Sequence, residues 1–507
     1  MAKVTRRSFM KGVAAASTFA YIGGFAGVRQ FFSQNSQSRV FRVDHCPVHD
    51  GQLRHQGLDV LLELLASCGV YLYQTDTAHP WGGADGLLRS DDVAVIKVNC
   101  QWKCRGTTNT DLVRGLIYRI LQHPAGFTGE VVIIENGQGR GGFDGMAGGG
   151  NYAAWPEIAN NVHINAEEET VLTVDYLVNT VFHDPRVSSF LLDPISSTFI
   201  TAGDHTVNGY RRLGDISYPC FTSASGNRIE LREGIWENGA YNQGKLKLIN
   251  FPVLKTHGGT GITGALKHSY GILSMADGYS SVRHYAQSGT QCGKMWSLVR
   301  TPDLNILDCI WVSFESLGGY PPETTCRTNT LLAGIDPVAL DYYAAKHVLL
   351  PLRGTSAEEH DPDSFSGLSN HLADARDFIN SQGGIAGQPA RLGDENFQVI
   401  TASAGGTDTT PTRSGAGASG GGGGGCFIAT AAYGSRLAAE VVALQRLRDR
   451  CLLNTSPGRV LVSLYYKHSP KLAHLLSRSP LLRSVARTAL YPLVLVCRAA
   501  EALTRRR

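Results

Sequence analysis

Val93-Ala94-Val95-Ile96-Lys97-Val98-Asn99 is the stretch that decides the fold. Its run of apolar, largely β-branched residues is typical of a strand that is buried on both faces. Residues 109–122 follow with apolar side chains at helical spacing, and residues 131–135 (Val-Val-Ile-Ile-Glu) form a second buried-type strand. A strand, a helix and a strand in this order predict a right-handed crossover within a parallel sheet.

Further elements of the same kind surround this unit. We predict a helix over 58–65 and a strand over 70–73 before it, with residues 40–56 as a His-rich loop. After it, the pattern predicts strands at 247–253, 304–311 and 397–401, and helices near 264–273, 337–349 and 368–379. The fold class is therefore α/β, with a mixed, mainly parallel sheet, flanking helices and a small helical C-terminal module.

The composition divides the chain into four segments. Residues 1–39 form a basic N-terminal segment, residues 40–400 the α/β domain, and residues 401–425 a linker that ends in six consecutive glycines. Residues 426–507 have the apolar spacing of short amphipathic helices that Ser-Pro pairs interrupt. The chain thus consists of one large domain with appendages at both ends.

Charge is distributed unevenly between these segments. Residues 426–507 carry fourteen Lys and Arg against three acidic residues, whereas residues 40–425 carry 27 basic and 40 acidic side chains. The acidic domain argues against nucleic acid as a partner. The basic tail suits an anionic envelope or membrane surface, which we favour over acidic polymers or RNA.

The N-terminus contains an arginine pair, Arg6-Arg7, followed by Ser8-Phe9-Met10-Lys11 and a weakly apolar Ala/Gly-rich run. This arrangement resembles a twin-arginine export signal. The resemblance implies the twin-arginine translocase as a partner and a periplasmic or cell-envelope location. That route carries folded proteins, so it also implies a core that closes, or takes up a cofactor, before export.

Lysines and histidines gather around the end of the strand predicted at 247–253. Lys255 and Lys267 could hold a carboxylate or phosphate, and His257 could exchange a proton. His257 and His284 could instead be metal ligands. Open α/β sheets bind ligands at the carboxyl ends of their strands, which favours a functional site here. The alternative is that these side chains cap a helix and line a solvated loop.

A second group of polar residues follows the strand that contains Lys97. Asn99 lies at its carboxyl end, and Thr108 and Asn109 precede the next helix, where free amide groups favour an anion. Taken alone, an ordinary strand end with a capped helix is the better explanation of these residues. Together with Lys255, however, Lys97 and Asn99 indicate one shared cleft, to which we add Glu135 and Asp308 as ligand-binding candidates.

The segment Asp44-His45-Cys46-Pro47-Val48-His49 offers imidazole, thiolate and carboxylate groups within one loop. Such groups suit zinc, iron or copper, and we take His45, Cys46 and His49 as candidate metal ligands. No second ligand pair at defined spacing accompanies them, so polar loop residues are the alternative.

Seven segments, in order along the chain, resemble the family called domain of unknown function 362. They are Ile96-Lys97-Val98-Asn99, Thr110 to Arg114, Val132 to Asn136, Pro252 to His257, Gly264 to Gly271, Asp303 to Asp308 and Ala333 to Asp341. The resemblance covers roughly residues 90–350 and implies the fold and site candidates without an activity. The family's usual Lys-Asn pair is Lys267-His268 here. Some relatives carry cysteine-rich ferredoxin modules, and because this chain has no such cluster an iron-sulfur cofactor is not supported.

The sequence Cys426-Phe427-Ile428-Ala429-Thr430 after the glycine linker resembles a C-terminal module named for its Cys-Phe-Ile box. Such modules occur on otherwise unrelated exported proteins, which implies sorting or attachment, with Cys426 as the modified or anchoring residue. A small helical domain with one buried cysteine is the alternative.

These observations lead to one functional expectation and one competitor. We expect an exported enzyme, dependent on a metal ion or another, unidentified cofactor, that acts on a small anionic substrate in a Lys/His-lined cleft. Lys97 and Lys255 would orient the substrate, with Lys267 beside them, and His257 would exchange a proton. The competitor is a non-catalytic envelope protein that binds a ligand or handles metal and is attached through its C-terminal module.

Overall fold

The computed structural model describes residues 38–47, 53–101, 104–136, 173–274, 282–319 and 322–405, together with five further positions at 165, 276, 484, 486 and 487. The twin-arginine segment, His49, nearly all of the glycine linker and Cys426 lie outside the described residues. By its contacts the chain divides into Met1–Pro411 and Thr412–Arg507, and the fold described below is that of the first unit.

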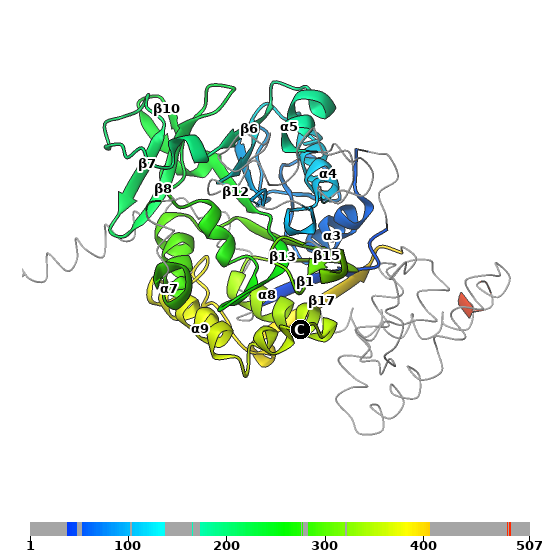
Figure 1. Cartoon of the computed structure of the whole chain (residues 1–507). Helices are drawn as coiled ribbons and strands as arrows, with labels where there is room; N and C mark the ends of the chain where they lie inside the picture. The colour runs from blue at the N-terminus through cyan, green and yellow to red at the C-terminus, as the bar shows by residue number, and fades with distance from the viewer. Residues whose placement is uncertain are drawn as a thin grey trace, which may run out of the picture. The chain divides into compact units, whose positions relative to one another are not determined.

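One large mixed sheet forms the centre of this unit (Figure 1). Its strands run parallel except for β16, which is antiparallel to both of its neighbours, and the short β14. This architecture confirms the predicted α/β fold with a mainly parallel sheet. In spatial order the strands are β17 (Phe397–Ser403), β1 (Ser38–Asp44), β16 (Thr325–Gly334), β15 (Leu304–Ser313), β12 (Leu246–Asn250), β4 (Val93–Lys97), β5 (Glu130–Glu135) and β6 (Val187–Leu191), with β13 (Val253–His257) beside β15 and β14 (Gly261–Thr263) beside β13.

The sheet separates two hydrophobic cores, as a strand buried on both faces requires. In β4, Val93 and Val95 point into one core while Ala94 and Ile96 point into the other. Helices α3 (Gln56–Ser67) and α4 (Thr110–Leu121) close the core that contains Ile96. The other core is covered by α8 (Pro337–Ala344) and α9 (Ser366–Ser381), and α7 (Ser288–Lys294) packs on α9. The alternating burial along one strand thus produces a three-layer domain.

A second sheet of five antiparallel strands packs against the core that contains Val93. Each strand pairs with the next one along the chain, and Figure 1 shows this sheet at one end of the domain. Its strands are β7 (Gly209–Leu213), β8 (Ile216–Thr222), β9 (Arg228–Glu230), β10 (Gly234–Glu237) and β11 (Ala240–Asn242). The sequence reasoning did not predict this sheet.

Three predicted elements need correction. The loop expected over 40–56 is wrong in its first part, because β1 lies there between β16 and β17. The single strand expected over 247–253 is two strands, since Pro252 lies between them and has no amide hydrogen for a ladder. The helix expected near 264–273 is only the 3₁₀ helix η7 (Lys267–Gly271).

The order of the strands creates a switch point at β4. The chain passes from β4 through α4 to β5 and then to β6, and it returns to form β12 on the opposite side of β4. Crossovers on the two sides of β4 therefore leave in opposite directions, which opens a crevice at the carboxyl ends of the strands. Within the described residues, none of the helices combines the length and apolar character needed to cross a membrane.

Candidate functional site

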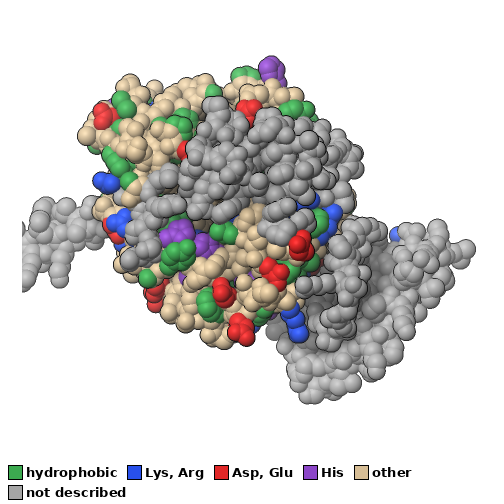
Figure 2. Space-filling model, in the orientation of Figure 1, with side chains coloured by type: hydrophobic (Ala, Val, Ile, Leu, Met, Phe, Trp, Pro, Cys, Tyr) green, Lys and Arg blue, Asp and Glu red, His purple; other side chains and the backbone are tan. Residues whose placement is uncertain are grey.

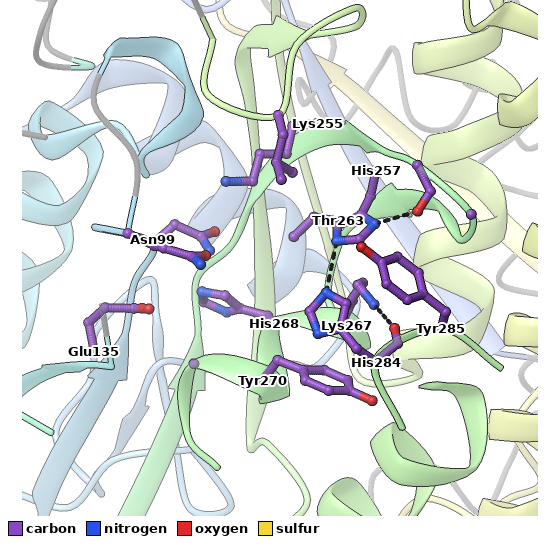
Figure 3. Close-up of a pocket in the computed structure, with 15 residues that line it drawn as sticks. Asn99, Glu135, Lys255, His257, Thr263, Lys267, His268, Tyr270, His284 and Tyr285 are labelled. Atoms are coloured by element: carbon purple, nitrogen blue, oxygen red, sulfur yellow. Dashed lines mark hydrogen bonds between the residues drawn. The ribbon is translucent and has the colours of Figure 1, made fainter. Parts of the chain in front are cut away.

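A cavity of about 500 Å³ lies at these carboxyl ends. Its polar side chains come from the segment after β4, from β5, β13 and β14, and from the short helices η7 and η8 (Val282–Ala286) (Figure 3). On the face seen in Figure 2, histidine side chains form a group beside hydrophobic ones. The residues that line the cavity are Asn99, Gln101, Glu135, Lys255, His257, Gly258, Gly259, Thr263, Lys267, His268, Tyr270, Gly271, His284, Tyr285 and Leu317.

Lys97 and Glu135 form a buried ion pair at one side of the cavity. The Nζ atom of Lys97 lies 2.5 Å from Oε2 of Glu135, and the two side chains are 0% and 2% exposed. Burial lowers the pKa of Lys97 and raises the pKa of Glu135 to about 8, while each partner opposes the shift of the other. Gly271 covers the pair, because a Cβ atom at this position would overlap Nζ of Lys97. Glu135 lines the cavity, whereas Lys97 does not.

Lys255 reaches the cavity from β13. Its side chain is buried, and Nζ donates a hydrogen bond to the carbonyl of Gly106 at 2.7 Å. Asn99 fixes the neighbouring strand end, since its Oδ1 accepts a hydrogen bond from the amide of Val253 at 3.0 Å. Figure 3 shows the amine of Lys255 directed toward Asn99. The predicted proximity of these residues at one sheet edge is therefore present.

Lys267 is a buried amine without a carboxylate partner among the described residues. Its Nζ atom donates one hydrogen bond, to the carbonyl of His284 at 2.6 Å, and lies 4.7 Å from the ring centre of Tyr270 and 5.7 Å from that of Tyr285. Burial lowers the pKa of Lys267 to about 7. A neutral amine is therefore well populated near neutral pH, because nothing charged compensates the buried ammonium.

His257 and His284 face each other through their Nε2 atoms, which are 3.3 Å apart. Nδ1 of His257 lies 2.9 Å from the carbonyl of Gly258, so this nitrogen carries the proton and Nε2 accepts a hydrogen bond from His284. Burial first, and then the positive charge of Lys267, hold the pKa of His257 well below its ordinary value. His257 is thus a neutral imidazole whose Nε2 atom can exchange a proton with the ring of His284.

His268, which the sequence reasoning did not select, is the third histidine of the cavity. Its Nδ1 atom lies 2.6 Å from Oδ1 of Asn250, whose amino group donates to the carbonyl of Ala265 and to Oδ1 of Asn305. These acceptors fix the orientation of the Asn250 amide, so His268 must donate from Nδ1. Burial and the charge of Lys97 keep the pKa of His268 well below its ordinary value. Its Nε2 is then a buried acceptor that has no hydrogen-bond partner among the described residues.

Asp341 of α8 holds the turn that presents Lys267 and His268. Its Oδ1 and Oδ2 atoms accept hydrogen bonds from the amides of Ala265 and Leu266 at 2.6 and 2.9 Å. Gly264 permits this close approach, because a Cβ atom there would overlap Oδ1 of Asp341. Two hydrogen bonds to the Asp341 carboxylate therefore fix the backbone before η7, in a segment where the sequence predicted a longer helix.

Three other predicted ligand-binding residues do not line the cavity. Asn109 caps α4 by accepting hydrogen bonds from the amides of Asp111 and Leu112. Thr108 accepts a hydrogen bond from the amide of Asn99 and donates one to a backbone carbonyl. Asp308 is buried, and its Oδ2 atom accepts a hydrogen bond from the amide of Asn109 at 2.8 Å. These side chains join β4, α4 and β15 and so shape the site from outside.

The residues proposed around Cys46 lie apart from the cavity. His45 is exposed, has a positive φ of 57°, and places Nδ1 3.1 Å from Oγ of Ser403. Cys46 is buried and its Sγ faces the carbonyl of Val43 at 3.8 Å. Within the described part of the chain, no three His, Cys, Asp or Glu side chains form a group that could hold a metal ion. His49 lies outside that part.

Comparison with known proteins gives one family and no individual relative. Neither the curated proteins nor the solved structures contain a match to this chain. The resemblance expected over roughly residues 90–350 is confirmed for its second half, which contains Lys255, Lys267 and Asp341. Residues 246–346 match the family described as "Domain of unknown function (DUF362)".

Proposed function

We propose that the chain is an enzyme that binds a small anionic substrate in this cavity and transfers a proton to or from it. The observation that carries the proposal is the charge of the lining. Lys255 and Lys267 both contribute amines, whereas Glu135 is the one carboxyl group among the described lining residues, and Lys97 already pairs with it. Two amines beside a single, already paired carboxyl group favour an anionic group on the substrate.

The histidines give this binding site its chemistry. His257 and His268 both line the cavity, and burial holds both rings neutral. Nε2 of His257 accepts a hydrogen bond from His284, whereas Nε2 of His268 has no partner among the described residues. Neutral imidazoles next to lysine charges can remove a proton from a bound acid whose anion those charges stabilise. His284 extends this route from His257 toward Tyr285, which is half exposed.

The binding half of the proposal is tested with Lys255→Met. We expect the affinity for oxalate, measured by isothermal titration calorimetry, to fall about 30-fold or more, which corresponds to about 2 kcal/mol for a lost buried charge contact. Lys294→Met is the matched control, because Lys294 pairs with Asp215 away from the cavity. Equal oxalate affinity in the Lys255 variant and the wild type would contradict the proposal. Lys255→Gln, which retains a donor for Gly106, serves if the methionine variant does not fold.

A non-catalytic envelope protein with the same cavity is the competing function. It shares the expected loss of oxalate binding in Lys255→Met, so calorimetry alone does not separate the two. Solvent hydrogen exchange into a bound carbon acid does separate them, because only an enzyme that transfers protons accelerates it. His257→Ala should abolish that exchange while leaving oxalate bound.

We place this activity outside the cytoplasm, on the basis of the sequence at the two ends of the chain. Arg6-Arg7 resembles a twin-arginine signal, and the basic residues 426–507 suit an anionic surface. Replacing both arginines by lysine should retain the protein in the cytoplasm in a cell-fractionation assay. Deleting residues 426–507 should move the exported protein from the membrane fraction to the soluble fraction. Continued attachment of the deletion variant would point to the apolar N-terminal segment as the anchor.

A further inference from the structure

The proposed function does not explain why the two lysines of the cavity have different hydrogen-bond partners and surroundings. Resting on that anion site, we propose that Lys267 is a nucleophile that condenses with the carbonyl carbon of a 2-oxo acid to form an imine, while Lys255 holds the carboxylate. The substrate class is therefore a small molecule with a ketone next to a carboxylate. Inorganic anions and oxalate would occupy the same cavity without forming a bond.

The surroundings of Lys267 favour a neutral amine over a charged ammonium group that would pair with an anion. Its side chain is 4% exposed, two aromatic rings cover it, and no carboxylate of the described residues pairs with it. A neutral amine can donate one hydrogen to the carbonyl of His284 and keep its lone pair for attack. Burial also lowers the pKa of Lys267 to about 7, which is how proteins activate nucleophilic lysines.

Lys255 differs from Lys267 in the way that the two roles require. It donates to the carbonyl of Gly106 and points toward Asn99, so its amine is held as a fixed donor at the opposite part of the lining. His257 lies between the two lysines in the same lining, because it follows Lys255 on β13 and its ring meets that of His284, whose carbonyl accepts the hydrogen bond from Lys267. A substrate with a carboxylate at Lys255 would thus present its neighbouring carbonyl toward Lys267 and the histidines.

The reaction balances with groups that the cavity supplies. The lone pair of Nζ forms the C–N bond as the carbonyl π bond breaks, the oxygen takes up a proton, and the nitrogen releases one, giving a carbinolamine. A second proton converts the hydroxyl group to water, which leaves as the nitrogen forms the C=N bond, and the nitrogen then releases its remaining proton. His257 and His284 lie beside Lys267 and can carry these protons in both directions. The products are one imine and one water.

Borohydride trapping on the full-length protein tests this inference. Pyruvate followed by sodium borohydride should convert the imine into a stable secondary amine, seen as one added pyruvate-derived group in the intact mass. Peptide mapping of the wild-type protein should place that group on Lys267, which needs no variant. Lys267→Arg keeps the charge but cannot form the imine, so we expect complete loss of the adduct. Lys294→Arg is the matched control and should be labelled as the wild type is.

Calorimetry with oxalate on the same preparation separates this inference from the function on which it rests. Oxalate binding without a pyruvate adduct overturns the imine and leaves the anion site standing. Absence of both oxalate binding and adduct overturns both proposals. An adduct on other lysines, with Lys267 unmodified, also overturns the imine. An adduct on Lys267 that oxalate suppresses supports both proposals.

Discussion

Replacing Glu135 by Leu should make the free energy of unfolding rise with pH, whereas replacing Lys97 by Met should make it fall with pH. The reason is that the two side chains form an ion pair with exposures of only 0% and 2%. Each variant leaves one titratable group in the interior without its partner. Such a loss typically costs about 3 to 5 kcal/mol, and the remaining group avoids part of this cost by becoming neutral.

The sign of each slope depends on whether the folded or the unfolded protein binds more protons. In Glu135→Leu, burial lowers the pKa of Lys97 and the carboxylate that opposed this shift is gone. The unfolded chain then binds a proton that the folded protein has released, so stability rises with pH up to the ordinary pKa of lysine. In Lys97→Met, Glu135 keeps the proton in the folded state, because its pKa is already raised to about 8 with Lys97 present. Stability is then highest below the ordinary pKa of glutamate and is lost as pH rises.

Urea unfolding between pH 5 and 9 measures both slopes, with a limiting value of about 1.4 kcal/mol per pH unit for one proton. The double variant Lys97→Met/Glu135→Leu is the control. It removes both charges together, so it should regain most of the lost stability and show neither slope. Slopes of the same sign in the two single variants would contradict the assignment of an isolated buried pair.

The elements that could be predicted from the sequence are those whose pattern is local. β4, α4 and β5 were predicted to within two residues at each end, because apolar periodicity alone specifies them. β1 was not predicted, because the histidines that follow it led us to interpret residues 40–56 as one loop. The antiparallel sheet β7–β11 was missed because its strands have only three to seven residues and its pairing depends on turns.

For the site, the sequence predicts the location of several residues, but not the contacts that determine their chemistry. Lys255, His257, Lys267 and His284 line one cavity, since strand ends of a parallel sheet converge and the sequence shows which residues follow each strand. The role of His268 could not be predicted, because its proton position depends on Asn250, which lies 18 residues away. Lys97 was predicted to bind substrate, and its pairing with Glu135 joins positions 38 residues apart. Contacts between distant segments set the chemistry of residues whose location was already evident.

Asp341→Ala should lower the free energy of unfolding by about 2 to 6 kcal/mol and abolish measurable oxalate binding. Its carboxylate accepts the amides of Ala265 and Leu266, and neither the side chain nor these amides reach water. Each buried amide that loses its acceptor costs about 1 to 3 kcal/mol. The turn that begins at these amides carries Lys267 and His268, so its displacement removes the amine and the acceptor from the cavity together.

Asp336→Ala separates this effect on the site from a general loss of stability. Asp336 is the N-cap of the same helix, where its side chain accepts hydrogen bonds from the amides of Val338 and Ala339. Its loss should cost about 1 to 2 kcal/mol for the helix cap, and more in total because the amide of Arg391 also loses its acceptor. Because Asp336 contacts β1 and not η7, oxalate affinity should be unchanged. If both variants lost affinity equally, helix α8 as a whole would position the cavity, whereas a selective loss in Asp341→Ala assigns this task to one carboxylate and the turn that it holds.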